Sequence, residues 1–390
     1  MCHGTVVVQT GIGPVGLFWG RSRCLAAAPE RGARGPGRGS SLEAAIAESG
    51  GSVADLGEWG IIAALAARMP SGPLTAVGIG DDAAVVGVPS GSVVAAVDLL
   101  LEGQHFLLSW SSGYDVGVKA AARSLADIAA MGAVPTALLV ALAAPGALPA
   151  RWALDLADGL AFEAGRAGAG VVGGDTARAD KVLLSVTALG DLAGRPPVRR
   201  AGAAPGDVVA VAGPLGHSAA GYALLAAGAK PATAADAEAA PEAAPLALAG
   251  LMAAHLRPAP AYPAGPEAAL LGATAMIDVS DGLLADLGHV AAASDVWIDI
   301  DSSRLALGDP LAAAAAAVSS LSRTSAAGSP RSLPLQWALT GGEDHSLAAT
   351  FPPSASLPER WRVIGAARSG SGVTVDGEPY QGSPGWEHFR

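Results

Sequence analysis

The stretch Gly78-Ile-Gly-Asp-Asp-Ala-Ala-Val85 sets two adjacent carboxylates on a glycine turn, directly before a strand expected at residues 84–88. Such a turn has two explanations. Asp side chains commonly hydrogen-bond to nearby backbone in turns and need no further role. Carboxylates that converge on a cation would instead make the stretch part of a binding site. The other acidic motifs of the chain bear on which of these two explanations holds, and the full set of motifs is what points to a fold.

Other aspartates stand in short motifs within apolar segments, in a chain of which only 15% of the residues are charged. They are Asp98, which follows an apolar strand expected at 93–97; Asp127 in SLADIAAMG (124–132); Asp175 in GGDT (173–176); and Asp278 and Asp281 in DVSDG (278–282). A helix N-cap is an alternative for the last pair. Carboxylates that converge repel one another and lose hydration unless cations neutralise them. Mg²⁺ is the usual cation there and usually also binds phosphate, so the motifs predict a metal-dependent phosphate-transfer site.

Lysine is scarce, which makes these aspartates more informative. The chain holds three lysines, and it contains neither the Gly-x-x-x-x-Gly-Lys-[Ser/Thr] motif nor the protein-kinase motifs. A bound triphosphate would therefore be neutralised by metal ions, arginines and backbone N–H groups. The formal net charge of −11 argues against a nucleic-acid partner, because a phosphate backbone requires clustered cations.

The bulk composition predicts a cytoplasmic protein of about two domains, since 390 residues with 51% hydrophobic content can bury sizeable cores. Both cysteines, Cys2 and Cys24, precede residue 25, so the rest of the chain has no disulfide framework and a reducing compartment fits. The uncharged stretch 128–150 is long enough to span a membrane. It contains prolines that would break such a helix, and we expect no membrane segment.

Residues 1–52 differ from the rest and are expected to be a disordered extension, since 31–41 (RGARGPGRGSS) shows no hydrophobic periodicity. The GxGxxG match at 11–16 is rejected as a dinucleotide site because no long helix follows it. The expected domains are an N-terminal one at 53–195 and a C-terminal one at 196–390. Helices are expected at 114–131 and 151–167, strands at 137–141 and 182–189, and alanine-rich surface insertions at 230–248 and 311–334.

Seven motifs occur in a recognisable order between residues 53 and 390. They are GIGDDAAVV (78–86), D-x-L-x-E-G-x-H-F (98–106), SLADIAAMGA (124–133), GGDT (173–176), R-x-G-A-x-P-G-D (200–207), DVSDGL-x-x-DL-x-H (278–289) and GGED (341–344). With them the chain resembles the thiamine-monophosphate kinase family, which shares a superfamily with aminoimidazole-ribotide synthetase, selenophosphate synthetase and a hydrogenase maturation protein. The second motif and the closing GWEHF (385–389) favour the thiamine-phosphate branch.

The resemblance implies a fold and an activity. The expected fold is α+β (mixed α/β), with the two-domain architecture of aminoimidazole-ribotide synthetase. The expected reaction is ATP-dependent phosphorylation of thiamine monophosphate to thiamine diphosphate, by direct in-line transfer assisted by several Mg²⁺ ions. The partners implied are ATP, thiamine monophosphate and a second copy of the chain in a homodimer.

The resemblance also implies site residues, motif by motif. Mg²⁺ ligands are implied at Asp82, Asp98, Asp127, Asp175, Asp278 and Asp281. ATP contacts are implied at Gly174, Asp175, Arg200 and Ser280, and thiamine monophosphate contacts at His105, Glu343 and Trp386. Asp127, Asp175 and Arg200 are expected to act in catalysis. Trp386 can stack on a cationic heteroaromatic ring, and Glu343 can complement the charge of that ring.

The chain departs from the family pattern at two places. Ala96 and Val97 stand where relatives often carry hydroxyls that help to hold metal, and His345 replaces the usual tyrosine after GGED. The alternative enzyme is another ATP-dependent member of the superfamily, such as an aminoimidazole-ribotide synthetase-like ligase. A nucleotide-binding protein without turnover is the non-enzymatic alternative.

Overall fold

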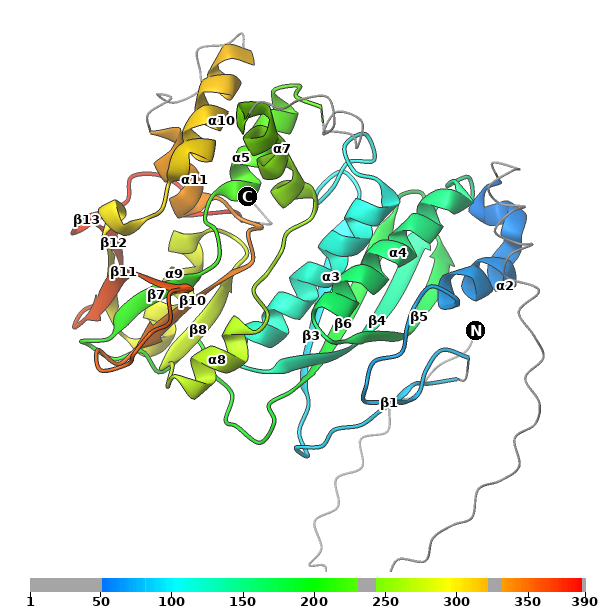
Figure 1. Ribbon diagram of the computed structural model, residues 1–390, viewed down its shortest axis with the longest axis horizontal. Coiled ribbons are helices and arrows are strands. Elements are labelled where there is room, and N and C mark those ends of the chain that lie inside the picture. Colours follow the sequence, from blue (N-terminus) through cyan, green and yellow to red (C-terminus); the bar gives the residue numbers. More distant parts are fainter. Residues whose placement is uncertain (1–50, 81, 231–242, 322–331, 388–390) are drawn as a thin grey trace, which may run out of the picture. The chain divides into compact units, whose positions relative to one another are not determined.

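The computed structural model describes residues 51–80, 82–230, 243–321 and 332–387. Most of the expected extension, including the GxGxxG match, lies outside these residues. Helices and strands alternate irregularly along the described chain (Figure 1), which confirms the mixed α/β class. Two large sheets lie on either side of the expected boundary at 195/196; the division into two domains stays a prediction.

The N-terminal half of the described chain contains a four-stranded sheet and three helices. The elements are α2 (Val53–Ala66), β1 (Thr75–Val77), β2 (Val85–Val86), β3 (Val94–Leu101), α3 (Gly113–Ala130), β4 (Val134–Ala144), α4 (Ala150–Arg166), β5 (Gly170–Arg178) and β6 (Leu183–Asp191). The sheet order is β3-β6-β4-β5, with β4 and β5 parallel and the other pairs antiparallel. The helices and strands expected between 114 and 189 are confirmed to within a few residues.

The strand expected at 93–97 is longer than predicted. We expected Asp98 just beyond its end, whereas β3 continues to Leu101, which pairs with Leu183 of β6. The apolar residues after Asp98 continue the alternation of a half-buried strand, with Leu100 fully buried. Asp98 therefore lies inside the strand, opposite Val186.

Helices α3 and α4 cover one face of this sheet (Figure 1). α3 begins at a capping box: the Asp115 N–H donates to Ser112 Oγ (3.2 Å), and the Ser112 N–H donates to the Asp115 carboxylate (2.9 Å). The two helices approach closely at glycines, since a Cβ on Gly117 would lie 2.2 Å from the carbonyl oxygen of Leu156. Nearly all of α3 is buried as a result.

The C-terminal half contains a seven-stranded sheet and a layer of helices. The elements are β7 (Val208–Ala212), α5 (His217–Ala226), α7 (Ala243–Leu256), α8 (Ala264–Leu270), β8 (Ala275–Val279), α9 (Leu283–Ser294), β9 (Trp297–Ile300), a 3₁₀ turn (Ser302–Arg304), α10 (Gly308–Leu321), α11 (Leu333–Thr340), β10 (Ser346–Phe351), β11 (Trp361–Arg368), β12 (Gly372–Val375) and β13 (Glu378–Pro379). The strand order is β13-β12-β9-β11-β7-β10-β8. Ile128 and Ala129 of α3 share a hydrophobic core with Met276 and Leu347 of this sheet, so α3 lies between the two halves.

The alanine-rich stretch expected at 311–334 is not a surface insertion where the structure describes it, whereas the expectation for 230–248 stays a prediction. Leu251 of α7 and Leu311 and Ala314 of α10 are buried against Leu224 of α5 in a separate core. Small side chains allow these helices to pack closely. Burial of a segment so low in aromatic residues was not expected from the sequence. The parts of both stretches at 231–242 and 322–331 lie outside the described residues.

Among the described residues, no helix combines the length and hydrophobicity needed to cross a membrane. The uncharged stretch 128–150 is divided between the end of α3, the strand β4 and the first residue of α4.

Candidate active site

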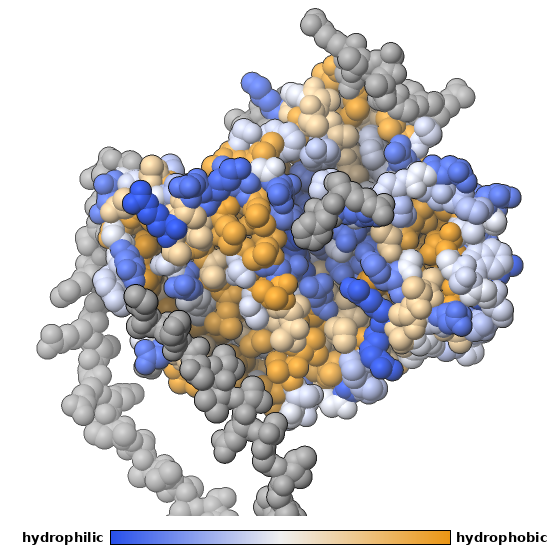
Figure 2. Space-filling view, turned by 180° about the vertical axis from the view of Figure 1, so that it is seen from behind, coloured by the Kyte–Doolittle hydropathy of each residue, from blue (hydrophilic) through white to orange (hydrophobic). Residues whose placement is uncertain are grey.

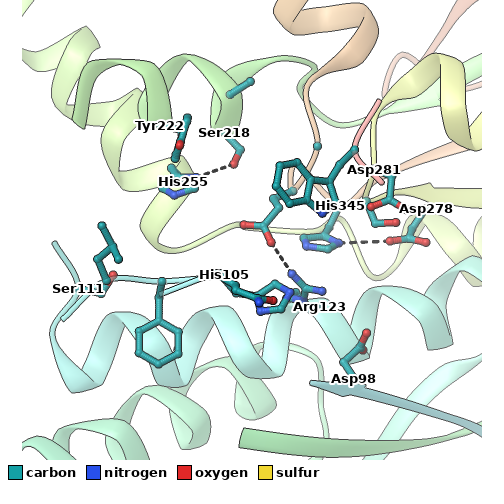
Figure 3. Close-up of a pocket in the computed structure, with 18 of the residues that line it drawn as sticks. Asp98, His105, Ser111, Arg123, Ser218, Tyr222, His255, Asp278, Asp281 and His345 are labelled. Carbon is teal, nitrogen blue, oxygen red and sulfur yellow. Dashed lines mark hydrogen bonds and ion pairs between the residues drawn. The ribbon is translucent and has the colours of Figure 1, made fainter. Parts of the chain in front are cut away.

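A cavity of about 550 Å³ gathers most of the predicted site residues (Figure 3). Its wall is formed by the segment after β3, by α3, α5 and α7, by the end of β8 and by the loop before β10. The predicted residues that line it are Asp98, His105, Asp127, Arg200, Asp278, Ser280, Asp281, Glu343 and Trp386. Because they come from segments far apart in the sequence, only the fold brings them together.

Carboxylates gather at one end of this cavity (Figure 3). Burial, followed by the neighbouring charges of Asp278 and Asp98, raises the pKa of Asp127 to about 8. One carboxylate oxygen of Asp98, Oδ2, is buried without a hydrogen-bond partner. Buried acidic groups in this state require a proton or a cation, so this end of the cavity is suited to bind positive charge.

The donor set of the acidic end fits Mg²⁺, which the family resemblance implies. All of its donors are oxygen atoms, and Asp98 Oδ2 has an unused acceptor position. Within the described ranges, no three His, Cys, Asp or Glu residues form a group that could hold a metal ion by themselves. Mg²⁺ in phosphate-transfer sites usually takes one or two carboxylates and completes its shell with water and substrate phosphate. The residues therefore fit an ion that binds together with a phosphate ligand.

A charged cluster occupies the middle of the cavity wall. The Glu343 carboxylate is 2.5 Å from Lys119 Nζ through Oε2 and accepts a hydrogen bond from Arg123 Nη1 through Oε1. Burial opposes ionisation of Glu343, but the two cations outweigh it and hold the pKa of this carboxyl below its usual range. Lys119 Nζ also donates to the carbonyl oxygen of His105 (3.0 Å).

Lys119 and Arg123 were not among the predicted site residues, although the sequence contained a signal for them. They precede Asp127 at four-residue intervals, which places all three on one face of α3. Lys119 is one of three lysines in the chain and is only 2% exposed. A buried lysine on an apolar helix nearly always has a charged partner, but that partner, Glu343, lies 220 residues beyond Arg123 in the sequence.

The loop before β10 holds several site groups in a strained backbone. Glu343 and His345 both have positive φ, 64° and 51°, a region that non-glycine residues rarely adopt. His345 is buried, and its Nδ1 lies 3.2 Å from Asp278 Oδ2. Asp344, which lies between Glu343 and His345 in the sequence, accepts hydrogen bonds from the N–H groups of Gly216 (2.5 Å) and Ser218 (2.8 Å). These bonds attach the loop to the start of α5.

The end of the cavity opposite the carboxylates is aromatic and uncharged. Tyr222 contacts the rings of Trp110 and His255 edge to face, at centroid distances of 5.9 Å and 5.5 Å. His255 Nδ1 lies 3.1 Å from Ser218 Oγ. Burial, followed by the nearby charge of Lys119, lowers the pKa of His255 to about 3, so the imidazole is neutral at physiological pH. This end can enclose an aromatic ring and hydrogen-bond to it.

His105 lies between these two ends (Figure 3), and Trp386 lines the cavity next to the acidic end, where its backbone N–H donates to the carbonyl oxygen of Asp281 (2.9 Å). His105 Nδ1 accepts a hydrogen bond from the Leu101 N–H (3.0 Å), which places the proton of a neutral imidazole on Nε2. Trp386 is 64% exposed, so its ring has an uncovered surface on which a ligand could stack.

Asp98 and Asp175 point to opposite faces of the four-stranded sheet, because residues paired across strands share a face and neighbouring rows alternate. One row of paired residues consists of Asp98, Val186, Val140 and Gly174. The next row consists of Leu99, Ser185, Ala141 and Asp175. Val186 is fully buried under the helices and Leu99 is 50% exposed. Asp98 therefore faces the helices, and Asp175 faces the uncovered side.

The remaining predicted residues also lie outside the main cavity. Gly174 and Asp175 lie on β5, the edge strand of the sheet, and so also border a second cavity of about 120 Å³, whose other walls are α2, α4 and β4. Asp82 is exposed and lines neither cavity. A single copy of the described chain does not bring Asp82, Gly174 and Asp175 together with the other site residues. Their assignments stay predictions.

Comparisons with known proteins agree on one family. The family model described as AIR synthase related protein, N-terminal domain, matches residues 80–192. The thiamine-monophosphate kinase of Mycobacterium tuberculosis is 44% identical over 346 residues, which cover 88% of this chain and 95% of that protein. The crystal structure of the thiamine-monophosphate kinase from Stenotrophomonas maltophilia is 33% identical, with a TM-score of 0.67 over 82% of this chain and 95% of that one. The structure titled "AaThiL complexed with AMPPCP and TMP" is 32% identical, with a TM-score of 0.64 over 86% and 98%.

Proposed function

The chain belongs to the thiamine-monophosphate kinase family, and on that basis we propose that it transfers the γ-phosphoryl group of ATP to thiamine monophosphate in the cavity described above. The main support is one cavity that joins an acidic end to an aromatic end. The solved structure of a relative, AaThiL, is a complex with AMPPCP and TMP. The products would be thiamine diphosphate and ADP.

The chemistry of the acceptor means that the transfer needs no general base. The acceptor is a phosphomonoester whose second pKa is ~6, so its attacking oxygen is already ionised at neutral pH. We propose direct in-line transfer: this oxygen forms a bond to the γ-phosphorus as the bond to the bridging oxygen breaks, and ADP leaves with the electron pair. The principal obstacle is repulsion between two anions.

The residues of the acidic end would overcome that repulsion. Asp98, Asp127, Asp278 and Asp281 would hold Mg²⁺, whose chemistry when bound is to neutralise and align the phosphate oxygens. Arg200 and Ser280, which line the same end, would bind the ATP phosphates. Asp127 and Arg200 would contact the groups that react.

The acceptor would occupy the rest of the cavity. Trp386 would stack on the cationic ring through its exposed face. His105 would donate from Nε2 to the acceptor phosphate. Glu343 would act at the same site, with its carboxylate oriented by Lys119 and Arg123.

We further propose that the working form is a cytoplasmic homodimer. The uncovered face of the four-stranded sheet carries exposed apolar side chains, with Val97 63% and Leu99 50% exposed. Figure 2, which views the molecule from behind, shows apolar residues gathered there. Asp175 lies on the same face, so a second chain packed on it would approach the predicted ATP and metal residues Gly174 and Asp175. The absence of cysteine after residue 24 suits a reducing compartment.

The experiment that tests the function is incubation of the protein with ATP, Mg²⁺ and thiamine monophosphate, followed by chromatography of the products. We expect thiamine diphosphate and ADP in equal amounts. ADP release that requires an amidine substrate and ignores thiamine monophosphate would favour the ligase alternative. ATP binding by calorimetry without any product would favour a nucleotide-binding protein.

A further inference from the structure

We propose that Arg123 binds the phosphate group of the acceptor and that Glu343 and Lys119 position it. This inference rests on the proposed function and adds a residue to it. The sequence motifs do not include Arg123, and they suggest for Glu343 a partner of opposite charge on the acceptor ring. In the structure that partner is Arg123 itself, together with Lys119.

The order of groups along the cavity places Arg123 where the acceptor phosphate must lie. Figure 3 shows Asp98, Asp278 and Asp281 at one end and Tyr222 and His255 at the other. Arg123 and His105 lie between these ends. An acceptor with its ring at the aromatic end and ATP at the acidic end has its phosphate in the middle, beside Arg123.

The charge of the cluster favours an anion. Glu343 carries one negative charge and is held ionised by two cations, so the cluster has a net charge of one positive unit. Arg123 and Lys119 also repel one another, which lowers the pKa of Lys119 in addition to the larger effect of its burial. A phosphate bound at Arg123 would offset this repulsion, whereas the cationic ring of the acceptor would add to it.

The hydrogen-bonding capacity of Arg123 is largely unused. Within the described part of the chain, its side chain makes one hydrogen bond, from Nη1 to Glu343. Its Nε is buried and has no partner. A guanidinium offers five N–H donors in a planar fork that matches phosphate geometry, and buried donors are normally satisfied. A bound phosphate would supply the missing acceptors, while Glu343 fixes the orientation of the plane.

The acidic groups near Arg123 do not fill this role. Asp127 follows Arg123 by one helical turn along α3, but the ion pair of Arg123 is with Glu343. Arg123 makes no ion pair with Asp127. Arg200 thus serves the ATP end of the cavity and Arg123 the acceptor end.

The test compares two ligands that differ only in the phosphate, thiamine monophosphate and thiamine, by calorimetry on the wild type, Arg123→Met and Arg123→Lys. In Arg123→Met, the affinity for thiamine monophosphate should fall by about 10- to 100-fold, as for the loss of a charge-assisted hydrogen bond. The affinity for thiamine should change little. Arg123→Lys keeps the charge and the pair with Glu343, so it should fold normally and show an intermediate loss. Arg151→Met, which removes an exposed arginine paired with Asp155, is the matched control.

The outcomes separate the two proposals. If both ligands lost affinity equally, or if both Arg123 variants kept the wild-type preference for thiamine monophosphate over thiamine, Arg123 would only support the fold. That result would overturn the role of Arg123 and leave the kinase function standing. In steady-state kinetics, we expect Arg123→Met to have a higher KM for thiamine monophosphate than the wild type and an unchanged KM for ATP. A wild type that neither binds nor phosphorylates thiamine monophosphate would overturn both proposals.

Discussion

Asp127 shows how a single buried carboxyl can link stability to pH. Its pKa of about 8 is far above the ordinary value of 3.8, so the folded metal-free protein keeps a proton that the unfolded chain releases. A carboxyl whose pKa is raised by folding stabilises the folded state fully at pH values below its pKa in the unfolded chain. This stabilisation is lost as the pH rises through its pKa in the folded protein. The metal-free protein should therefore lose stability between about pH 4 and pH 8.

Asp127→Asn should reduce this loss, because burial also raises the pKa of Asp286 and of Asp344 to about 7 and both stay in the variant. It should abolish kinase activity, because the amide cannot ionise or neutralise a cation. Thermal melting in chelator at pH 6, 7 and 8 should show a decline in the wild type, by up to about 1.4 kcal/mol per pH unit for one group, and a flatter profile in the variant. Asp180→Asn, at an exposed turn, is the control and should melt like the wild type. Full activity in Asp127→Asn would show that its assignment as a metal ligand is wrong.

Individual acidic residues were predictable where an apolar context made a carboxylate costly, as at Asp98 and Asp127. The cluster of Lys119, Arg123 and Glu343 was not, because it joins helix α3 to a loop more than 200 residues away. Spacing along α3 indicates which side chains share a face, but only tertiary structure shows what lies opposite. For the same reason, the sequence did not reveal that the Glu343 carboxylate pairs with Lys119 and Arg123; its contact with the acceptor stays a prediction.

At the scale of elements, the position of α3 depends on its close contact with α4. Arg123 and Asp127 of the site lie on α3, and glycines let the backbones of α3 and α4 approach. A Cβ on Gly117 would lie 2.2 Å from backbone oxygen, whereas a Cβ on Gly165 of α4 would meet nothing within 4 Å.

These two glycines make a matched pair. Gly117→Ala should destabilise the protein by about 1–3 kcal/mol, because the helices must separate, and should reduce activity through displacement of Asp127. Gly165→Ala should be neutral or stabilising by up to about 1 kcal/mol, since alanine favours the helix. Denaturant unfolding of both variants measures the difference. Equal stability in the two variants would contradict the packing described for α3 and α4.

The helices and strands between 114 and 189 followed from hydrophobic periodicity, since each has one face in a core. The misjudged elements were those whose packing depends on partners. β3 continues past Asp98 because β6 pairs with it, and α7 and α10 are buried because α5 provides the opposite surface. Composition alone made the alanine-rich helix α10 look like an insertion.

At the scale of the whole molecule, one described chain leaves Asp175 on the uncovered side of the sheet and Asp98 on the other. Leu99→Glu should therefore disrupt a homodimer formed through that face, by burying a charge in an apolar interface, and should lower activity. Leu270→Glu, at an equally apolar but separate exposed position on α8, is the control. Light scattering with size exclusion should give dimer for the wild type and the control, and monomer for Leu99→Glu. A monomeric, fully active wild type would contradict the homodimer.

The transfer itself is tested most directly by isotope labelling. ATP that carries ¹⁸O at the three non-bridging oxygens of its γ-phosphoryl group is incubated with the protein, Mg²⁺ and thiamine monophosphate, and the thiamine products are analysed by mass spectrometry. We expect thiamine diphosphate that contains all three labelled oxygens, with one ADP for each molecule formed. Labelled inorganic phosphate with unchanged thiamine monophosphate would contradict this expectation.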